Sequence, residues 1–166
     1  MINKINKLSE SEFIKVFANI FEKAVWIAEE LYKQKPFNDY EDLSSKMLDI
    51  FENTSKKNQI KILNAHPDLA NNTKISSLTQ DSIKEQNSAG LDQCTENEFN
   101  EFKNLNDKYK KRFGFPFIYA VKGKSKIEIL NNFKRRVSYD INIEFIEAAK
   151  QVKKIASLRI NEINIE

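Results

Sequence analysis

The sequence predicts an all-α protein, and three observations lead to this prediction. Helix-breaking residues are rare, since the 166 residues include only 3 glycines and 3 prolines. Lysine, glutamate, asparagine, isoleucine and leucine are abundant, and apolar residues recur at the spacing of one helix face. A chain of this length buries most of its apolar surface as one unit. We therefore expect a single compact domain over residues 1–166, with about seven helices and one short extended segment.

Three helices are predicted in the first part of the chain. The first begins at Ser9 and Glu12, which have capping-box spacing, and should end before Pro36. Its apolar face consists of Phe13, Phe17, Ile20, Phe21, Ala24, Ile27 and Leu31. The second helix is marked by Tyr40, Leu43, Met47, Leu48 and Phe51, and the third by Ile60 and Leu63.

Four more helices are predicted after a polar loop between Pro67 and Gln80, which should contain at most one helical turn. Their expected ranges are about 81–89, 95–113, 125–137 and 141–163. Gly90 suits the left-handed position that closes the first of them. Capping boxes at Thr95 and at Ser125 mark where the next two begin.

The stretch "FGFPFIYAV", residues 113–121, is the one β-like segment. Pro116 lacks an N–H group and disfavours a central strand, so we expect an extended segment packed against helices. Its backbone groups need hydrogen-bond partners outside a helix. These partners could be neighbouring backbone groups, or they could be the amide edge of a planar heterocyclic ligand. Trp26 and the phenylalanines lie on helical stripes, which favours a place in the core.

Composition limits the classes of partner and compartment. The 27 basic and 24 acidic residues are interspersed, which argues against nucleic acid as a partner. We find neither a signal peptide nor an apolar run of roughly 20 residues that could span a membrane. Cys94 is the only cysteine, which excludes an intrachain disulfide and fits a reducing compartment. Since "NINIE" is not a peroxisomal signal, we expect a cytoplasmic protein.

The only histidine, His66, is followed directly by Pro67. Proline disfavours the α conformation in the residue before it, so the imidazole should lie at a helix end or in a loop. Histidine can move protons near neutral pH. A single histidine also serves often as a structural residue, and its position alone does not separate the two roles.

The predicted helix "DSIKEQNSA" carries Ser82, Glu85, Gln86 and Ala89 on one face. The face therefore combines a hydroxyl, a carboxylate and an amide. It could be an ordinary solvated face. Alternatively, it is a row of hydrogen-bonding groups that orients a small polar substrate, with the carboxylate close enough to influence an imidazole.

Arg159 occupies a position in the apolar stripe of the last predicted helix, between Ile155 and Ile163. A guanidinium cannot lose its charge when it is buried. It should therefore reach out to solvent, pair with an internal acid, or face a pocket. In a pocket, its planar set of donors would suit a substrate carboxylate.

Six motifs taken together resemble the family of 2-oxo-4-hydroxy-4-carboxy-5-ureidoimidazoline (OHCU) decarboxylases, over nearly the whole chain. In order they are "FEKAVWIAEELYKQKPF", "AHPDLA", "SIKEQNSAGL", "LNDKYKKRFGFPFIYAV", "ILNNFKRR" and "IASLRI". The ordered set, and above all "HPDLA", "S..EQ..AGL" and "FGFPFI", is much more specific than any one motif.

The resemblance implies an all-helical enzyme of urate breakdown that needs no metal or organic cofactor and often forms a homodimer. Its substrate would be OHCU, the unstable product of 5-hydroxyisourate hydrolysis, and its product S-allantoin. By motif matching, His66 resembles the catalytic histidine and Glu85 the acid that works with it. The implied substrate-binding residues are Pro67, Ser82, Gln86, Phe117, Ile118 and Arg159, with Phe117 and Ile118 acting through their backbone.

Two alternatives stay open at this point. The chain could be a helical protein–protein interaction domain, in which case Ser82, Glu85 and Arg159 would lie apart on the surface. It could also be a decarboxylase of a related ureido or imidazolinone acid, because pocket dimensions determine specificity and sequence spacing does not reveal them.

Overall fold

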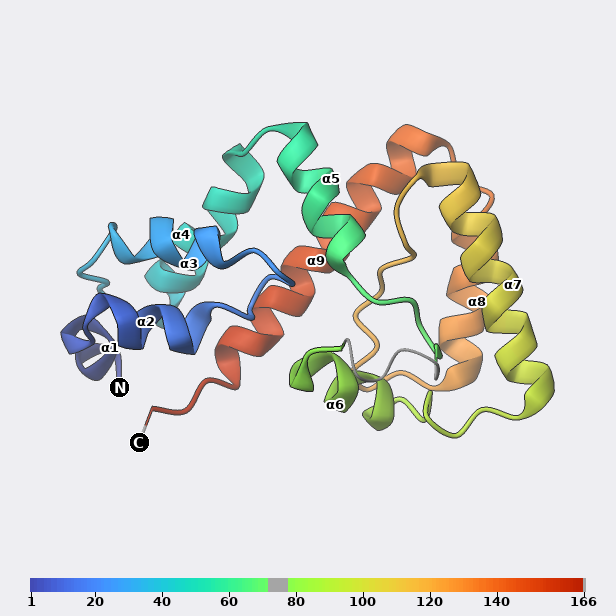
Figure 1. Ribbon diagram of the computed structural model, residues 1–166, viewed down its shortest axis with the longest axis horizontal. Coiled ribbons are helices and arrows are strands. Elements are labelled where there is room, and N and C mark those ends of the chain that lie inside the picture. The colour runs from blue at the N-terminus through green and yellow to red at the C-terminus, as the bar shows by residue number, and fades with distance from the viewer. Residues whose placement is uncertain (72–77, 166) are drawn as a thin grey trace. The chain divides into compact units, whose positions relative to one another are not determined.

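A computed structural model of the chain describes residues 1–71 and 78–165 (Figure 1). Within these ranges it has nine α-helices and no strand, so the predicted all-α fold class is confirmed. The helix count is higher than predicted for two reasons. A short helix, α1 (Ile2–Lys7), precedes the first predicted helix, and that predicted helix is divided in two.

The divided helix consists of α2 (Glu10–Phe17) and α3 (Val25–Tyr32). Between them Lys23 adopts the left-handed backbone conformation, with φ of 52°, which interrupts a right-handed helix. Ile20 and Phe21 are buried in this turn. Because the turn also directs apolar residues inward, the helical spacing continues across it, and the prediction of one helix was wrong.

The other helices lie close to their predicted ranges. They are α4 (Tyr40–Asn53), α5 (Lys56–Ala65), α6 (Gln80–Ser88), α7 (Glu96–Phe113), α8 (Lys126–Arg136) and α9 (Ile141–Asn161). The predicted capping boxes are present at the starts of α2, α7 and α8. Gly90 and Gly114 follow α6 and α7 with φ of 73° and 78°, the left-handed conformation that suits glycine. The predicted loop before α6 includes residues 72–77, which lie outside the described residues.

The chain packs as two compact units, and the first comprises Met1–Ile62 with the last residues of the chain. In this unit α3 packs against both α2 and α4 (Figure 1). Phenylalanine rings fill its core. The ring centroids of Phe13 and Phe17 are 4.4 Å apart, and those of Phe21 and Phe51 are 5.3 Å apart.

The second unit comprises Leu63–Val152, and in it α7 and α8 lie side by side (Figure 1). Its core is built around Tyr109. The Tyr109 ring lies 4.5–6.0 Å from the rings of Phe113, Phe115, Phe117 and Phe133. That residues 1–166 act as a single domain stays a prediction.

The expected extended segment connects α7 to α8 and contains neither helix nor strand. Two of its backbone groups bind side chains. The Ile118 carbonyl accepts a hydrogen bond from Arg136 Nη1 at 2.8 Å, and the Ala120 N–H donates to Gln151 Oε1 at 3.1 Å. We had expected neighbouring backbone or a ligand as partners. Because no strand runs beside the segment in the described ranges, side chains from α8 and α9 bind these groups instead.

Candidate active site

His66 lies in a bend directly after α5, where its N–H donates to the Leu63 carbonyl at 3.2 Å. This is the helix-end position that the following proline predicted. The residue is half-buried, and its Nε2 atom is enclosed by the protein. The imidazole therefore lies where a partly enclosed site can form.

The loop that follows His66 is tied down by side chains from two helices. Its contacts are Lys110 with Asp68 at 2.6 Å, Asn106 Nδ2 with the Leu69 carbonyl at 3.0 Å, and Gln86 Oε1 with the Ala70 N–H at 3.1 Å. Ala70 has φ of 56°, a conformation that costs a residue with a Cβ about 1–2 kcal/mol. The bond from Gln86 thus holds a strained backbone beside the histidine.

The polar face of α6 is turned toward the protein interior. Ser82 is 3% exposed and Gln86 8% exposed, while Glu85 is half-buried. The Thr79 hydroxyl donates to Ser82 Oγ at 3.1 Å. This is not the ordinary solvated face considered above. The amide nitrogen of Gln86 forms no hydrogen bond with another described residue, so it can donate to a bound molecule.

Arg159 lies in the first unit and is 4% exposed. Its Nη1 donates to the carbonyls of Asn19 and Ile20 at 3.1 and 3.3 Å, and its Nη2 donates to Glu22 Oε1 at 3.1 Å. Glu22 is itself only 2% exposed. Arg159 therefore pairs with an internal acid, Glu22, which is one of the three environments that we expected for it. Sequence reasoning missed Glu22, because its partner is more than a hundred residues away.

A pocket of about 330 Å³ opens in the first unit, and Glu22 lines it together with Trp26 and Lys61. Trp26 is half-buried at the start of α3 and so is not the core residue we expected. The buried residues of α3 are Ile27, Ala28 and Leu31, and Trp26 lies off this face.

Phe117 and Ile118 are 1% and 2% exposed. The Phe117 ring stacks on Phe133 with centroids 3.9 Å apart, and the Arg136 guanidinium lies 4.5 Å from its centroid. The side chains of this segment therefore serve the core. That the backbone of this segment contacts a ligand stays a prediction.

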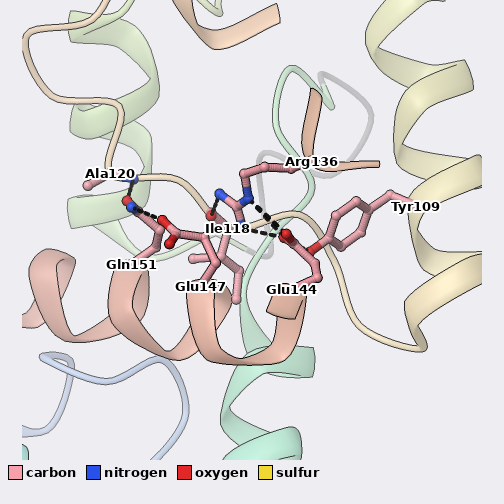
Figure 2. Close-up of polar contacts among 7 residues, drawn as sticks. All are labelled: Tyr109, Ile118, Ala120, Arg136, Glu144, Glu147 and Gln151. Atoms are coloured by element: carbon pink, nitrogen blue, oxygen red, sulfur yellow. Dashed lines mark hydrogen bonds and ion pairs between the residues drawn. The ribbon is translucent and has the colours of Figure 1, made fainter. Parts of the chain in front are cut away.

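Beside this segment lies a buried polar cluster that sequence reasoning missed, formed by Tyr109, Arg136 and Glu144 (Figure 2). Arg136 Nε donates to both carboxylate oxygens of Glu144, at 2.9 and 3.2 Å, and Arg136 Nη2 and the Tyr109 hydroxyl donate to one of them. Burial raises the pKa of Tyr109 well above its usual range, and the adjacent carboxylate reinforces this. A signal was available, since Arg136 is three residues after Phe133 on the apolar face of α8.

The second unit contains most of the predicted site residues, namely His66, Pro67, Ser82, Glu85, Gln86, Phe117 and Ile118. The first unit contains Arg159. No group of three or more potential metal ligands occurs among the described residues. The Gln86 bond to Ala70 joins the motifs "HPDLA" and "S..EQ", which are separate in sequence.

Residues 6–161 match the family model described as OHCU decarboxylase. The chain belongs to the OHCU decarboxylase family. This membership confirms the resemblance seen in the ordered motifs, and with it the expectation that the protein is an enzyme of the decarboxylase class.

Two relatives illustrate the range of proteins similar to this OHCU decarboxylase family member. The 2-oxo-4-hydroxy-4-carboxy-5-ureidoimidazoline decarboxylase of Haloferax volcanii is 36% identical, and the match covers 97% of this chain and 94% of that protein. The uric acid degradation bifunctional protein of Bacillus sp. (strain TB-90) is 40% identical over 98% of this chain. The chain spans only 32% of that bifunctional protein.

Two crystal structures share this fold. An (S)-allantoin synthase matches with a TM-score of 0.78 and 27% identity, over 97% of this chain and 53% of that chain. An OHCU decarboxylase solved in the presence of (S)-allantoin matches with a TM-score of 0.68 and 25% identity, over 82% of this chain and 89% of that chain.

Proposed function

We propose that this protein catalyses the decarboxylation of OHCU to S-allantoin in urate degradation, without a metal or organic cofactor. Family membership over residues 6–161 supports the reaction. The structural observation that carries the proposal is the Gln86 bond to Ala70. It ties the loop after the only histidine to the helix that carries a buried hydroxyl, a carboxylate and an amide.

In this proposal His66 moves the protons. The substrate carbon that bears the carboxylate also bears a hydroxyl and adjoins a C=N unit. When the bond to the carboxylate breaks, CO₂ leaves, the electron pair moves into that unit, and the nitrogen of the unit takes up a proton. A proton must then reach one face of the ring, and the hydroxyl proton must leave as a carbonyl forms. His66 can serve as base and as acid, with Glu85 orienting the imidazole and raising its basicity.

The remaining residues of the second unit would hold the substrate. Ser82 and Gln86 present a hydroxyl and an amide from a buried helix face, and such groups fix the orientation of a small polar ligand. Pro67 would form part of the wall beside the histidine. The backbone at Phe117 and Ile118 would contact the ring.

Arg159 would bind a carboxylate or the ureido carbonyl by charge-assisted hydrogen bonds. Glu22 and the carbonyls of Asn19 and Ile20 hold the group in one orientation.

The first test generates OHCU in place from urate, with uricase and hydroxyisourate hydrolase, and follows allantoin by circular dichroism. We expect rapid formation of S-allantoin with the wild-type protein. His66→Ala should lower the rate by about 10²- to 10⁴-fold, the usual contribution of an acid–base group.

Asn64→Ala is the matched control, because Asn64 is exposed near the end of α5, two residues before His66, and its replacement should leave turnover unchanged. Racemic allantoin at the uncatalysed rate, from folded wild-type protein, would contradict the proposed reaction. If a related ureido or imidazolinone acid reacted instead, the site would be retained and the substrate assignment would be wrong.

We also propose that the protein is a cytoplasmic homodimer. Exposed Ile143 and Ile146, three residues apart on α9 and 56% and 68% exposed, supply apolar surface that a second copy could cover. Cys94 is a free thiol, as in a reducing compartment, and no described helix is long and apolar enough to cross a membrane. Light scattering that gives the mass of one chain would contradict the homodimer. Fractionation that places the protein outside the cytoplasm would contradict the location.

A further inference from the structure

The segment between α7 and α8 is bound along one edge of its backbone. In an extended chain, the N–H and C=O groups of alternate residues lie on the same edge. Ile118 and Ala120 are two residues apart, and they are bound by Arg136 from α8 and Gln151 from α9 (Figure 2). These two side chains therefore hold a single edge of the segment.

The opposite edge carries the backbone groups of Phe117 and Tyr119. Neither residue forms a hydrogen bond with another residue in the described ranges. A row of free N–H and C=O groups binds molecules that present amide groups in the same alternation. The ureido and ring amides of the proposed substrate have this character.

Arg136 cannot move without breaking several bonds. Its Nη1 binds the Ile118 carbonyl, while its Nε and Nη2 bind Glu144. Arg136 and Glu144 are 1% and 0% exposed, so water cannot replace any of these contacts. A planar guanidinium anchored to a buried carboxylate thus sets the direction of the Ile118 carbonyl.

Gln151 is oriented in the same manner. Its Nε2 donates to Glu147 Oε1 at 2.8 Å, which turns the amide oxygen toward the Ala120 N–H (Figure 2). The side chain is 7% exposed. Both contacts on the bound edge therefore come from buried side chains, and each of these is oriented by one carboxylate. Glu144 orients Arg136, and Glu147 orients Gln151.

We propose that Arg136 and Gln151 are positioning residues for the decarboxylation, which fix the backbone of residues 117–120 so that its free edge holds the amide groups of the substrate. This inference rests on the proposed function. Neither side chain touches the substrate in this account. Their effect arises because a shift of about 1 Å in a substrate-positioning group can lower kcat/KM by about 10²-fold.

The test compares Arg136→Lys and Gln151→Met with Lys134→Met. Lysine keeps the charge opposite Glu144 but lacks the planar set of donors that binds the carboxylate and the Ile118 carbonyl in fixed directions, and methionine keeps the volume of Gln151 without the acceptor. Lys134 is on the same helix as Arg136, in a half-exposed pair with Glu101. Since its ion-pair partner is Glu101 and not the backbone of residues 117–120, Lys134→Met serves as the control.

We expect both test variants to raise KM about tenfold or more and to change kcat by less than about threefold, the pattern of lost substrate binding. Amide exchange at residues 117–120 should accelerate, with α7 unchanged. A variant that had merely lost stability would lower kcat with the folded fraction and leave KM unchanged. That result, or unchanged exchange in the segment, would overturn the inference.

The two proposals fail in different ways. If folded wild-type protein does not convert OHCU, the proposed function is wrong. The exchange experiment then still reports whether Arg136 and Gln151 fix the segment, and unchanged exchange would overturn that part. If the wild-type protein is active and both variants keep its KM, only the positioning role is wrong.

Discussion

At the scale of single residues, the structure places polar side chains at positions that belong to apolar stripes. Asn106 follows Phe102 by four residues on α7, Arg136 follows Phe133 by three on α8, and all four residues are at most 5% exposed. Each polar member reaches a backbone carbonyl in another segment. A buried polar group is tolerated only when it is hydrogen-bonded, so such positions mark contacts that set the course of the chain.

The pair of Glu22 and Arg159 leads to a prediction of this kind. Glu22→Gln keeps an oxygen acceptor but leaves the buried guanidinium without a neutralising charge. We expect the free energy of unfolding to fall by about 2 kcal/mol, the worth of a buried hydrogen bond to a charged group, as measured by urea unfolding.

Glu30→Gln provides the comparison, because Glu30 pairs with Lys33 on the protein surface with both side chains about half exposed. An exposed pair contributes roughly 0–1 kcal/mol. Equal losses in the two variants would show that the Glu22 carboxylate contributes no more than a surface charge.

At the scale of helices, local patterns accounted for most of the fold. The capping boxes predicted where α2, α7 and α8 begin, and Gly90 predicted where α6 ends. These signals are local, since each involves residues at most four apart. Helix boundaries that depend on them were therefore accessible from the sequence.

The division between α2 and α3 was not accessible in this way. In the turn, the carbonyls of Asn19 and Ile20 accept hydrogen bonds from the Arg159 side chain. The sequence indicated that Arg159 needs a partner, but not which segment supplies it. Likewise, the helix-end position of His66 and the polar face of α6 could be predicted from spacing, whereas their proposed roles came from the family resemblance. Asn106, Arg136 and Glu144 join segments that only the fold brings together.

The capping box of α7 gives a prediction at this scale. Thr95→Ala removes the side-chain oxygen that accepts from the Glu98 N–H, so the free energy of unfolding should fall by about 1 kcal/mol. Thr95→Ser retains the oxygen and should restore most of the loss. Urea unfolding of the three proteins measures the difference, and a Thr95→Ser variant as unstable as Thr95→Ala would exclude the cap as the cause.

At the scale of the whole molecule, stability should depend on alkaline pH through Tyr109. Burial and the bond to Glu144 raise the pKa of this phenol above its ordinary value of 10.0. The folded state then retains the proton at pH values where the unfolded chain releases it. The protonated phenol therefore makes its full contribution to the free energy of unfolding below pH 10, and this contribution is lost as the pH rises above that value.

Tyr109→Phe should therefore be less stable than the wild-type protein at pH 7 and should lose less stability between pH 9 and pH 11. Urea unfolding across this range provides the measurement. Tyr139→Phe carries the same chemical change outside the buried cluster, and should follow the wild-type curve. Parallel curves for Tyr109→Phe and the wild-type protein would show that this phenol does not contribute to the pH dependence.

The sharing of one carboxylate by Tyr109 and Arg136 also constrains how this sequence can diverge. A replacement of Arg136 alone leaves the Glu144 charge uncompensated, and a replacement of Glu144 alone leaves a guanidinium in the same situation. Each single step is unfavourable, although the fold could accommodate a matched pair. We therefore expect these positions to change together or not at all during evolution, so that among related sequences they should covary more strongly than their separation along the chain would suggest.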